Sequence, residues 1–233
     1  MKGRLATDDV ELLERLSALQ CGLVRGLLTR ASEAEADRTA LQEARHRIKG
    51  HLQGLASFLG ARALSESSPS ARRALRTSVA RVQAIAGVQE AFAAGGATDL
   101  ARCGPDSLRH AFAEWAEELG VSLRVHFDPV PLDPRAAAHL MLIAAELVAN
   151  SLTHAFPGDR RGRLLLQLRR IGSEAVLLAR DNGRGLPGDF DLDHSSGLGL
   201  RLAQRLAAGL GGRLTLHCSR GVSARVVFPL ELP

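Results

Sequence analysis

LIAAELVANSLTHAF, residues 142–156, reads as an apolar helix that carries polar side chains on one stripe. Glu146, Asn150 and His154 recur every four residues, and this spacing places them on one face of a helix. The other positions are mostly apolar, so we expect the rest of the helix to be buried. Such a helix would present a narrow polar face to a site and pack its remaining surface into a core.

Two glycine-containing stretches follow it, ARDNGRGLP at 179–187 and SSGLGLRLAQRLA at 195–207. Asp181 is expected to end a strand, where its carboxylate can accept a hydrogen bond from an exocyclic amine such as that of adenine. The glycines expected to shape the pocket are Gly183, Gly185, Gly197 and Gly199, with Leu198 between the last two. The first pair allows close approach of the backbone to a ring, and the second opens a helix whose N–H groups favour phosphate.

An amide oxygen from Asn150 suits Mg²⁺, which prefers oxygen ligands and shares itself between protein groups and phosphates. Each stretch alone is a weak signal, but a polar helix stripe, an Asp-x-Gly-x-Gly turn and a Gly-x-Gly helix entry together predict a nucleotide pocket. No GxxxxGK[ST] motif occurs, and the glycines follow paired strands, so neither a P-loop nor a Rossmann unit is indicated.

The surrounding pattern predicts an α/β two-layer sandwich, with helices on one side of a mixed sheet. The expected helices cover 105–119, 133–155 and 197–210, and the expected strands cover 121–127, 163–170, 175–181, 213–219 and 223–230. Asp133 and Pro134 supply an N-cap and a first-turn proline for the longest of these helices.

The first hundred residues read as helices over about 9–30, 32–64 and from Pro69 to Gly95. The second and third make an antiparallel hairpin with a short loop. Its apolar residues, among them Leu52, Leu55, Leu59, Val79 and Val82, exceed what one hairpin can bury. We therefore expect a dimer in which two hairpins form a four-helix bundle.

At 100° per residue, His46 lies about 160° from Ile48 and so faces away from the apolar stripe, together with Glu43. His51 lies within about 60° of that stripe and is expected to flank the core. A neutral imidazole is a nucleophile near neutral pH, so an outward His46 could receive a phosphoryl group from the nucleotide pocket.

Composition bounds the remaining possibilities. Three widely spaced cysteines, Cys21, Cys103 and Cys218, indicate neither a disulfide framework nor a zinc site. The net charge is +5, yet the arginines are spread through the sequence and aromatic residues make up 3%, which argues against nucleic-acid binding. The N-terminus lacks an apolar signal region, so we expect a cytoplasmic protein without membrane insertion.

These motifs resemble a GHKL-type ATPase domain joined to the hairpin of a sensor histidine kinase of the HWE/HisKA_2 subgroup. ELVANSLTHAF resembles the N box, DNGRGLP and GLGL the two glycine boxes, and EARHRIKGHLQGLASFL the H box. The resemblance implies an α+β chain: an N-terminal helix at 1–37, a dimerisation and phosphotransfer hairpin at 38–96, and an ATP-binding domain of the Bergerat fold at 97–233. It makes His46 the phosphoacceptor, Asn150 the Mg²⁺ ligand and Asp181 the adenine anchor, with His154 and the glycines lining the pocket.

The implied function is autophosphorylation of His46 from ATP and transfer of the phosphoryl group to an aspartate of a response regulator receiver domain, with input from a separate sensory protein or from the N-terminal helix itself. Relatives often place an acid beside the reactive histidine; here Arg47 stands there, so Glu43 or Glu146 would take the proton. Two alternatives remain open. One is a histidine phosphotransfer protein with a non-catalytic ATP domain, and the other is an anti-sigma-like serine kinase or binding module.

Overall fold

The computed structural model of the chain describes residues 38–93, 98–158, 161–188, 190–192 and 198–230. For residues 38–46, 88–93, 98–99 and 198 it describes the backbone element and not the side chain. The chain divides into two compact units, Met1–Ile48 and Lys49–Pro233, and the division falls inside the first described helix. The helix predicted over 9–30 lies outside the described residues.

Helices α2 (Arg38–Ser65) and α3 (Pro69–Ala93) form where the apolar spacing predicts them. The loop between them is short, because Pro69 begins α3 and the Ser68 hydroxyl accepts a hydrogen bond from the Ala71 N–H at 3.4 Å. A serine cap followed by proline at the first helical position is a start signal that the sequence shows directly.

The remaining elements follow in alternating order. They are α4 (Leu100–Glu118), β2 (Val121–Phe127), α5 (Pro134–His154), β4 (Gly162–Ile171), β5 (Glu174–Asp181), α6 (Leu198–Gly209), β6 (Arg213–Cys218) and β7 (Val222–Pro229), with a two-residue ladder between β1 (Thr98–Asp99) and β3 (Pro131–Leu132). The five-stranded sheet has the order β2-β4-β5-β7-β6; β2 and β4 run parallel and the other pairs are antiparallel.

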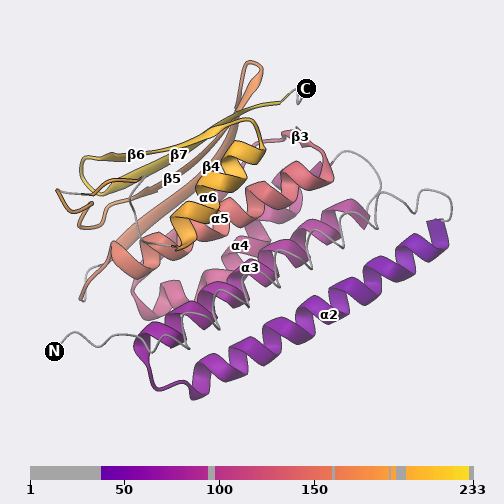
Figure 1. Ribbon diagram of the computed structural model, residues 1–233, viewed down its shortest axis with the longest axis horizontal. Helices are drawn as coiled ribbons and strands as arrows, with labels where there is room; N and C mark the ends of the chain where they lie inside the picture. The colour runs from indigo at the N-terminus through magenta and orange to yellow at the C-terminus, as the bar shows by residue number, and fades with distance from the viewer. Residues whose placement is uncertain (1–37, 94–97, 159–160, 189, 193–197, 231–233) are drawn as a thin grey trace. The chain divides into compact units, whose positions relative to one another are not determined.

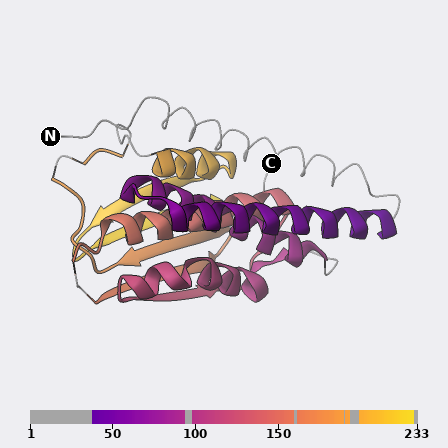
Figure 2. The same cartoon turned by 90° about the horizontal axis from the view of Figure 1, so that it is seen from below.

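The helices of the unit Lys49–Pro233 lie on one side of this sheet (Figure 1). Figure 2 shows α4 and α6 on either side of α5, and α3 packs against both α4 and α5. The α3 and α4 backbones approach closely, because a Cβ added to Gly87 would lie 2.2 Å from the Ser107 hydroxyl oxygen. The expected mixed α+β fold with a two-layer sandwich is confirmed.

Helix α5 is the centre of the core. Fourteen of its 21 residues are buried, and its first turn is capped by the Asp133 carboxylate, which accepts from the Ala136 N–H at 2.8 Å. By length and composition α5 is the one helix among the described residues that could cross a membrane. However, 78% of its most apolar window is buried inside the unit, as in the core helix of a folded domain.

Helix α4 begins at Leu100, five residues before the start that Pro105 predicted. Leu100, Gly104 and Leu108 are buried at four-residue spacing, so the extra turn gains packing for the helix. Proline removes one backbone donor and normally costs a helix interior about 3 kcal/mol. Burial of this apolar face outweighs that cost.

The apolar face of α2 differs from the prediction. Leu52, Leu59 and, on α3, Val82 are already buried within the chain, so they are not a surplus that needs a partner. His51, expected beside the core, is exposed. Among the side chains of α2 from Arg47 onward, the large apolar ones that are exposed are Phe58 and Leu64, at 68% and 81%.

The outer face of the sheet, which no helix covers in Figure 1, is rich in arginine. Its exposed arginines are Arg124, Arg163, Arg169, Arg180, Arg213 and Arg225, and they come from all five strands. The register places Arg124 and Arg180 on opposite sides of Leu165 in one row. Arginines that are scattered along the sequence are thus gathered on one surface by the two-residue period of the strands. We call these six residues the arginine face.

We predict that the stability of this unit falls as the pH drops below about 6.5, the usual pKa of histidine. Burial lowers the pKa of His139 on α5, and Arg135 lowers it further. The unfolded chain therefore takes up the proton first, and stability that is fully present above the unfolded pKa is lost as the pH falls. Urea unfolding at pH 7.5 and 5.5 measures the change in the free energy of unfolding, and His139→Gln should reduce that change. An equal loss of stability between the two pH values in both proteins would contradict the assignment.

Candidate functional site

The predicted site residues of α5 lie on one stripe with different environments. Glu146 is 1% exposed, Asn150 is half-buried and His154 at the end of the helix is exposed. The amide nitrogen of Asn150 is itself buried and has no hydrogen-bond partner among the described residues. Partial burial lowers the pKa of His154, and the nearby Arg184 and Arg73 lower it further.

Asp181 ends β5 and is buried beside this stripe. One carboxylate oxygen accepts hydrogen bonds from the backbone N–H groups of Gly183 at 2.9 Å and Val222 at 3.1 Å. The other accepts from the Ser151 hydroxyl on α5 at 3.1 Å. A carboxylate offers about four acceptor positions, so three are filled from within the protein and one remains.

The turn after Asp181 is pressed against the end of α5. A Cβ on Gly183 would lie 2.4 Å from the Ala155 carbonyl oxygen, and the Arg184 N–H donates to that same oxygen at 2.9 Å. Gly185 has φ = +82°, a backbone conformation that side chains disfavour. These contacts explain why glycine stands at both positions and why the turn holds Asp181 close to α5.

The second glycine pair is described in part. Gly197 lies outside the described residues, and Leu198 begins α6 without a described side chain. Gly199 packs on the site, because a Cβ there would lie 2.5 Å from a Glu146 carboxylate oxygen and 3.6 Å from the Asn150 amide oxygen. The start of α6 therefore meets the polar stripe of α5.

Arg81 on α3 completes this cluster, and the sequence patterns did not point to it. Its guanidinium donates two hydrogen bonds to the Glu146 carboxylate, from Nε to one oxygen and from Nη2 to the other at 2.9 Å. The two side chains are 12% and 2% exposed. The partners are 65 residues apart, so no local spacing could have revealed the pair.

Two of the predicted residues lie in the other unit. His46 and Glu43 fall within α2 as expected, but their side chains are outside the described part.

Thr153 lies on α5, and its hydroxyl donates to the Ala149 carbonyl oxygen at 2.7 Å. The Thr153 hydroxyl is therefore hydrogen-bonded within α5 itself.

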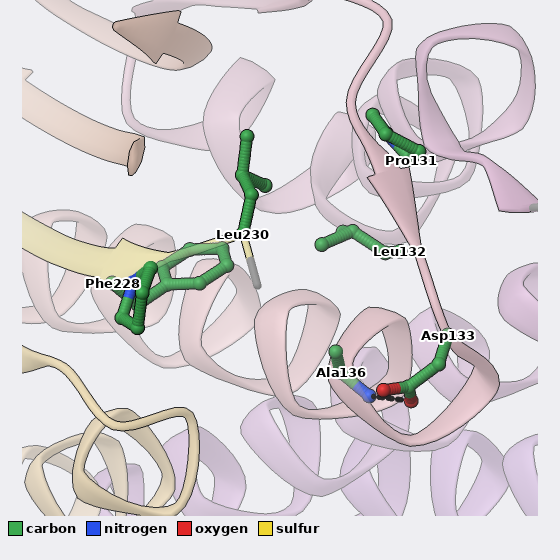
Figure 3. A pocket seen from close by; sticks show the side chains of 7 residues that line it. Pro131, Leu132, Asp133, Ala136, Phe228 and Leu230 are labelled. Carbon is green, nitrogen blue, oxygen red and sulfur yellow. Dashed lines mark hydrogen bonds between the residues drawn. The ribbon is translucent and has the colours of Figure 1, made fainter. Parts of the chain in front are cut away.

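Two hollows of the second unit lie away from this cluster. The first, of about 170 Å³, is lined by Pro131, Leu132, Asp133, Ala136, Phe228, Pro229 and Leu230 (Figure 3). Its one carboxylate, Asp133, already caps α5. The second, of about 1220 Å³, is open and runs between residues 186–192 and the strand β6. Neither is lined by Asn150 or Asp181.

The cluster itself fits a nucleotide and a divalent cation. A purine amine would donate to the unfilled acceptor position of Asp181, a phosphate oxygen would accept from the buried Asn150 amide nitrogen and from the N–H groups at the start of α6, and the Asn150 amide oxygen is a ligand of the kind that Mg²⁺ prefers. Buried polar groups without partners are uncommon in folded proteins, so this vacancy favours a ligand.

Comparison with known families agrees with this arrangement. Residues 43–102 match the family HisKA_2, described as histidine kinase, and residues 136–233 match HATPase_c, described as histidine kinase-, DNA gyrase B- and HSP90-like ATPase. The chain carries a HisKA_2-type histidine kinase core. The first match contains His46 and the second contains Asn150 and Asp181.

Named relatives have the same kinase core. The sensor histidine kinase PdtaS of Mycolicibacterium smegmatis is 30% identical over 76% of this chain and 36% of that protein. Blue-light-activated histidine kinase 2 of Erythrobacter litoralis is 28% identical over 83% of this chain and 56% of that protein. The chain thus spans between about a third and just over half the length of these curated relatives.

Solved structures share the fold. The histidine kinase domain of the Erythrobacter litoralis EL346 blue-light-activated kinase has a TM-score of 0.58 at 21% identity, covering 78% of this chain and 96% of that one. The Acinetobacter baumannii histidine kinase AdeS has a TM-score of 0.50 at 15% identity, covering 80% and 95%. At these identities the likeness concerns the fold of the kinase core.

We predict that Asp181→Asn weakens both ATP binding and the fold of the kinase core. The amide oxygen can keep the Gly183 and Val222 hydrogen bonds, but charge-assisted bonds become weaker neutral ones, and the NH2 group turns a donor toward the position where a purine amine would donate; each effect costs about 1–3 kcal/mol. Thermal unfolding and calorimetric titration with ATP measure the two effects. Asp106→Asn, which changes an exposed acid paired with Arg109 on α4, should alter stability by no more than about 0.5 kcal/mol. An unchanged melting temperature in Asp181→Asn would contradict the hydrogen bonds described.

Proposed function

We propose that this protein is an ATP-dependent histidine kinase that phosphorylates itself on His46 and passes the phosphoryl group to an aspartate of a response regulator receiver domain. The observation that carries the proposal is the pairing of Asp181 and Asn150. Asp181 has a single acceptor position left, and the buried amide nitrogen of Asn150 has no acceptor within the part of the chain that the structure describes. Residues 43–102 of the same chain match HisKA_2. ATP is the substrate that supplies groups of matching chemistry.

Each residue has a distinct role toward ATP. Asp181 would accept from the adenine amine, and Asn150 would contribute an oxygen ligand to Mg²⁺. Gly197, Leu198 and Gly199 would bring the N-terminus of α6 to the phosphates, where its N–H groups and dipole favour negative charge. Mg²⁺, when bound, offsets charge on the phosphate oxygens. Gly183 and Gly185 shape the adenine side, and His154 borders the stripe.

The chemical step forms one bond and breaks another. The lone pair of an imidazole nitrogen of His46 attacks the γ-phosphorus, and the bond from that phosphorus to the bridging oxygen breaks. The electron pair leaves with ADP, while the proton on the other ring nitrogen passes to a carboxylate, Glu146 or Glu43. Positioning and electrostatic stabilisation supply most of the catalysis in such transfers.

Partners follow from this chemistry. A phosphohistidine needs an acceptor, which we assign to the receiver domain of a response regulator, with a separate sensory protein as the source of input. We place the kinase in the cytoplasm, without nucleic acid as a partner and without insertion into a membrane. The proposed domain organisation is 1–37, 38–96 and 97–233.

We predict Mg²⁺-dependent ATP binding and acid-labile, base-stable label on His46 alone after incubation with γ-labelled ATP. His46→Ala should abolish the label, and Asn150→Ala should reduce it more than it reduces stability. His51→Ala is a stringent control, because His51 is exposed on the same helix yet should not be required.

The outcomes separate the alternatives. Absence of nucleotide binding in the parent protein would favour a histidine phosphotransfer protein with a degenerate, non-catalytic ATP domain. Acid-stable phosphate on a partner would favour an anti-sigma-like serine kinase. Label that persists in His46→Ala would exclude His46 as the phosphoacceptor.

A homodimer is part of this proposal, and the exposed face of α2 supports it. Phe58 and Leu64 are exposed within about 120° of helix surface in the C-terminal half of α2, which also carries Gly54 and Ala61. A Cβ on Gly54 would meet nothing within 4 Å, so another helix could approach closely there, while His46 lies about two turns or more toward the N-terminus, outside this surface. This face, and not the buried leucines of α2, is the surface we assign to the second copy.

We predict that Phe58→Glu with Leu64→Glu converts the dimer to a monomer, because the introduced charges would be buried against the partner copy. Light scattering at micromolar concentration measures the mass. The exposed apolar residue Ile171, at the tip of the β4–β5 hairpin, gives a matched control, and Ile171→Glu should leave the dimer intact. A monomeric parent protein would contradict the proposal.

A further inference from the structure

The pair Arg81–Glu146 joins the second helix of the hairpin to the stripe that carries Asn150. Both oxygens of the Glu146 carboxylate are engaged by the guanidinium, and both side chains are almost completely buried. A bidentate arginine–carboxylate contact is geometrically demanding, because both hydrogen bonds require one relative placement of the two helices. The pair therefore depends on the position of α3 against α5.

A second ion pair on α3 differs from Arg81–Glu146 in its exposure to solvent. Arg76 also makes a bidentate contact, with Glu118 of α4, but Glu118 is 53% exposed. Water screens such a surface pair, and its removal usually changes little. A buried pair that loses one partner leaves an uncompensated charge and is strongly disruptive. Of the two contacts, Arg81–Glu146 is the one that can hold α3 in place.

Glu146 also lies at the reacting end of the site. Gly199 at the start of α6 approaches its carboxylate, and Asn150 follows one turn later on the same stripe. Under the proposed function, this carboxylate is the acid on the ATP side that can take the proton released by His46. While Arg81 holds one acceptor position on each of its oxygens, the carboxylate is fixed toward α3, and only two of its about four acceptor positions stay open.

We propose that Arg81 is a positioning residue that withholds Glu146 in the resting kinase and releases it when α3 moves against α5. The inference rests on the proposed function. Helix α3 is joined to the helix of His46 by the three residues 66–68, so a displacement of the hairpin reaches Arg81 directly. The same movement that brings His46 to ATP would then free the proton acceptor, and the two events are coupled by one contact.

The experiment compares initial rates of His46 labelling at saturating ATP in the full chain. Arg81→Gln should raise the rate about fivefold or more, as expected when a coupling contact of ordinary size is removed. Arg81→Lys keeps the charge but loses the bidentate contact and should give a smaller rise in the labelling rate. Glu146→Gln should lower the rate about 100-fold, the usual effect of removing a general base.

The double variant Arg81→Gln/Glu146→Gln is the decisive comparison. It should show no rise over Glu146→Gln, because Arg81 acts only through Glu146. Arg76→Gln, which breaks the surface pair on the same helix, should stay within about twofold of the parent protein. A fall in rate in both Arg81 variants, or an equal rise with and without Glu146, would overturn the proposal.

Amide hydrogen exchange over residues 78–87 of α3 gives a readout that does not need kinase activity and that works if Arg81→Gln is poorly folded. Arg81→Lys should speed this exchange about tenfold relative to Arg76→Gln, since opening of α3 becomes easier. Absence of label in the parent protein would refute the proposed function, whatever the exchange shows. Unchanged exchange in Arg81→Lys would refute the Arg81 inference, even in an active kinase.

Discussion

Burial of α5 between the sheet and the helices α3, α4 and α6 is the constraint on which the rest of the structure depends. With two thirds of its residues inside the core, the helix has room for polar groups only along one narrow stripe. Those groups are then held by the core packing itself, and a buried polar group must find a partner or leave a costly vacancy. Glu146 pairs with Arg81 and Ser151 donates to Asp181, whereas the Asn150 amide nitrogen and His139 Nδ1 have no partner among the described residues.

The fold was largely predictable because its signals are local. Strand alternation, the cap at Asp133 and the glycines after α4 and α6 lie within a few residues of the element that they define, and most observed bounds agree closely with those expected. The start of α4 was missed because Pro105 is a strong local signal. Its cost is offset by burial of Leu100, which depends on the tertiary fold.

The site was predictable only as far as its groups share one helix or one turn. The relation of Asp181 to Ser151 and the contact of Arg81 with Glu146 depend on how separate elements pack, and no spacing in the sequence encodes them. The same holds for α2. Periodicity identified one apolar side of α2, but this helix has two apolar sides. Only the structure distinguishes the buried Leu52 and Leu59 from the exposed Phe58 and Leu64.

The arginine face also has a consequence for how copies of this protein meet. An open sheet surface with aliphatic side chains such as Leu165 and Leu178 between its polar rows would otherwise suit stacking on the same surface of another molecule. Six like charges on each surface make that approach repulsive over roughly the 8–10 Å screening distance of physiological salt. The arginine face thereby disfavours stacking of one sheet on another, a protection that depends on salt because the repulsion is screened.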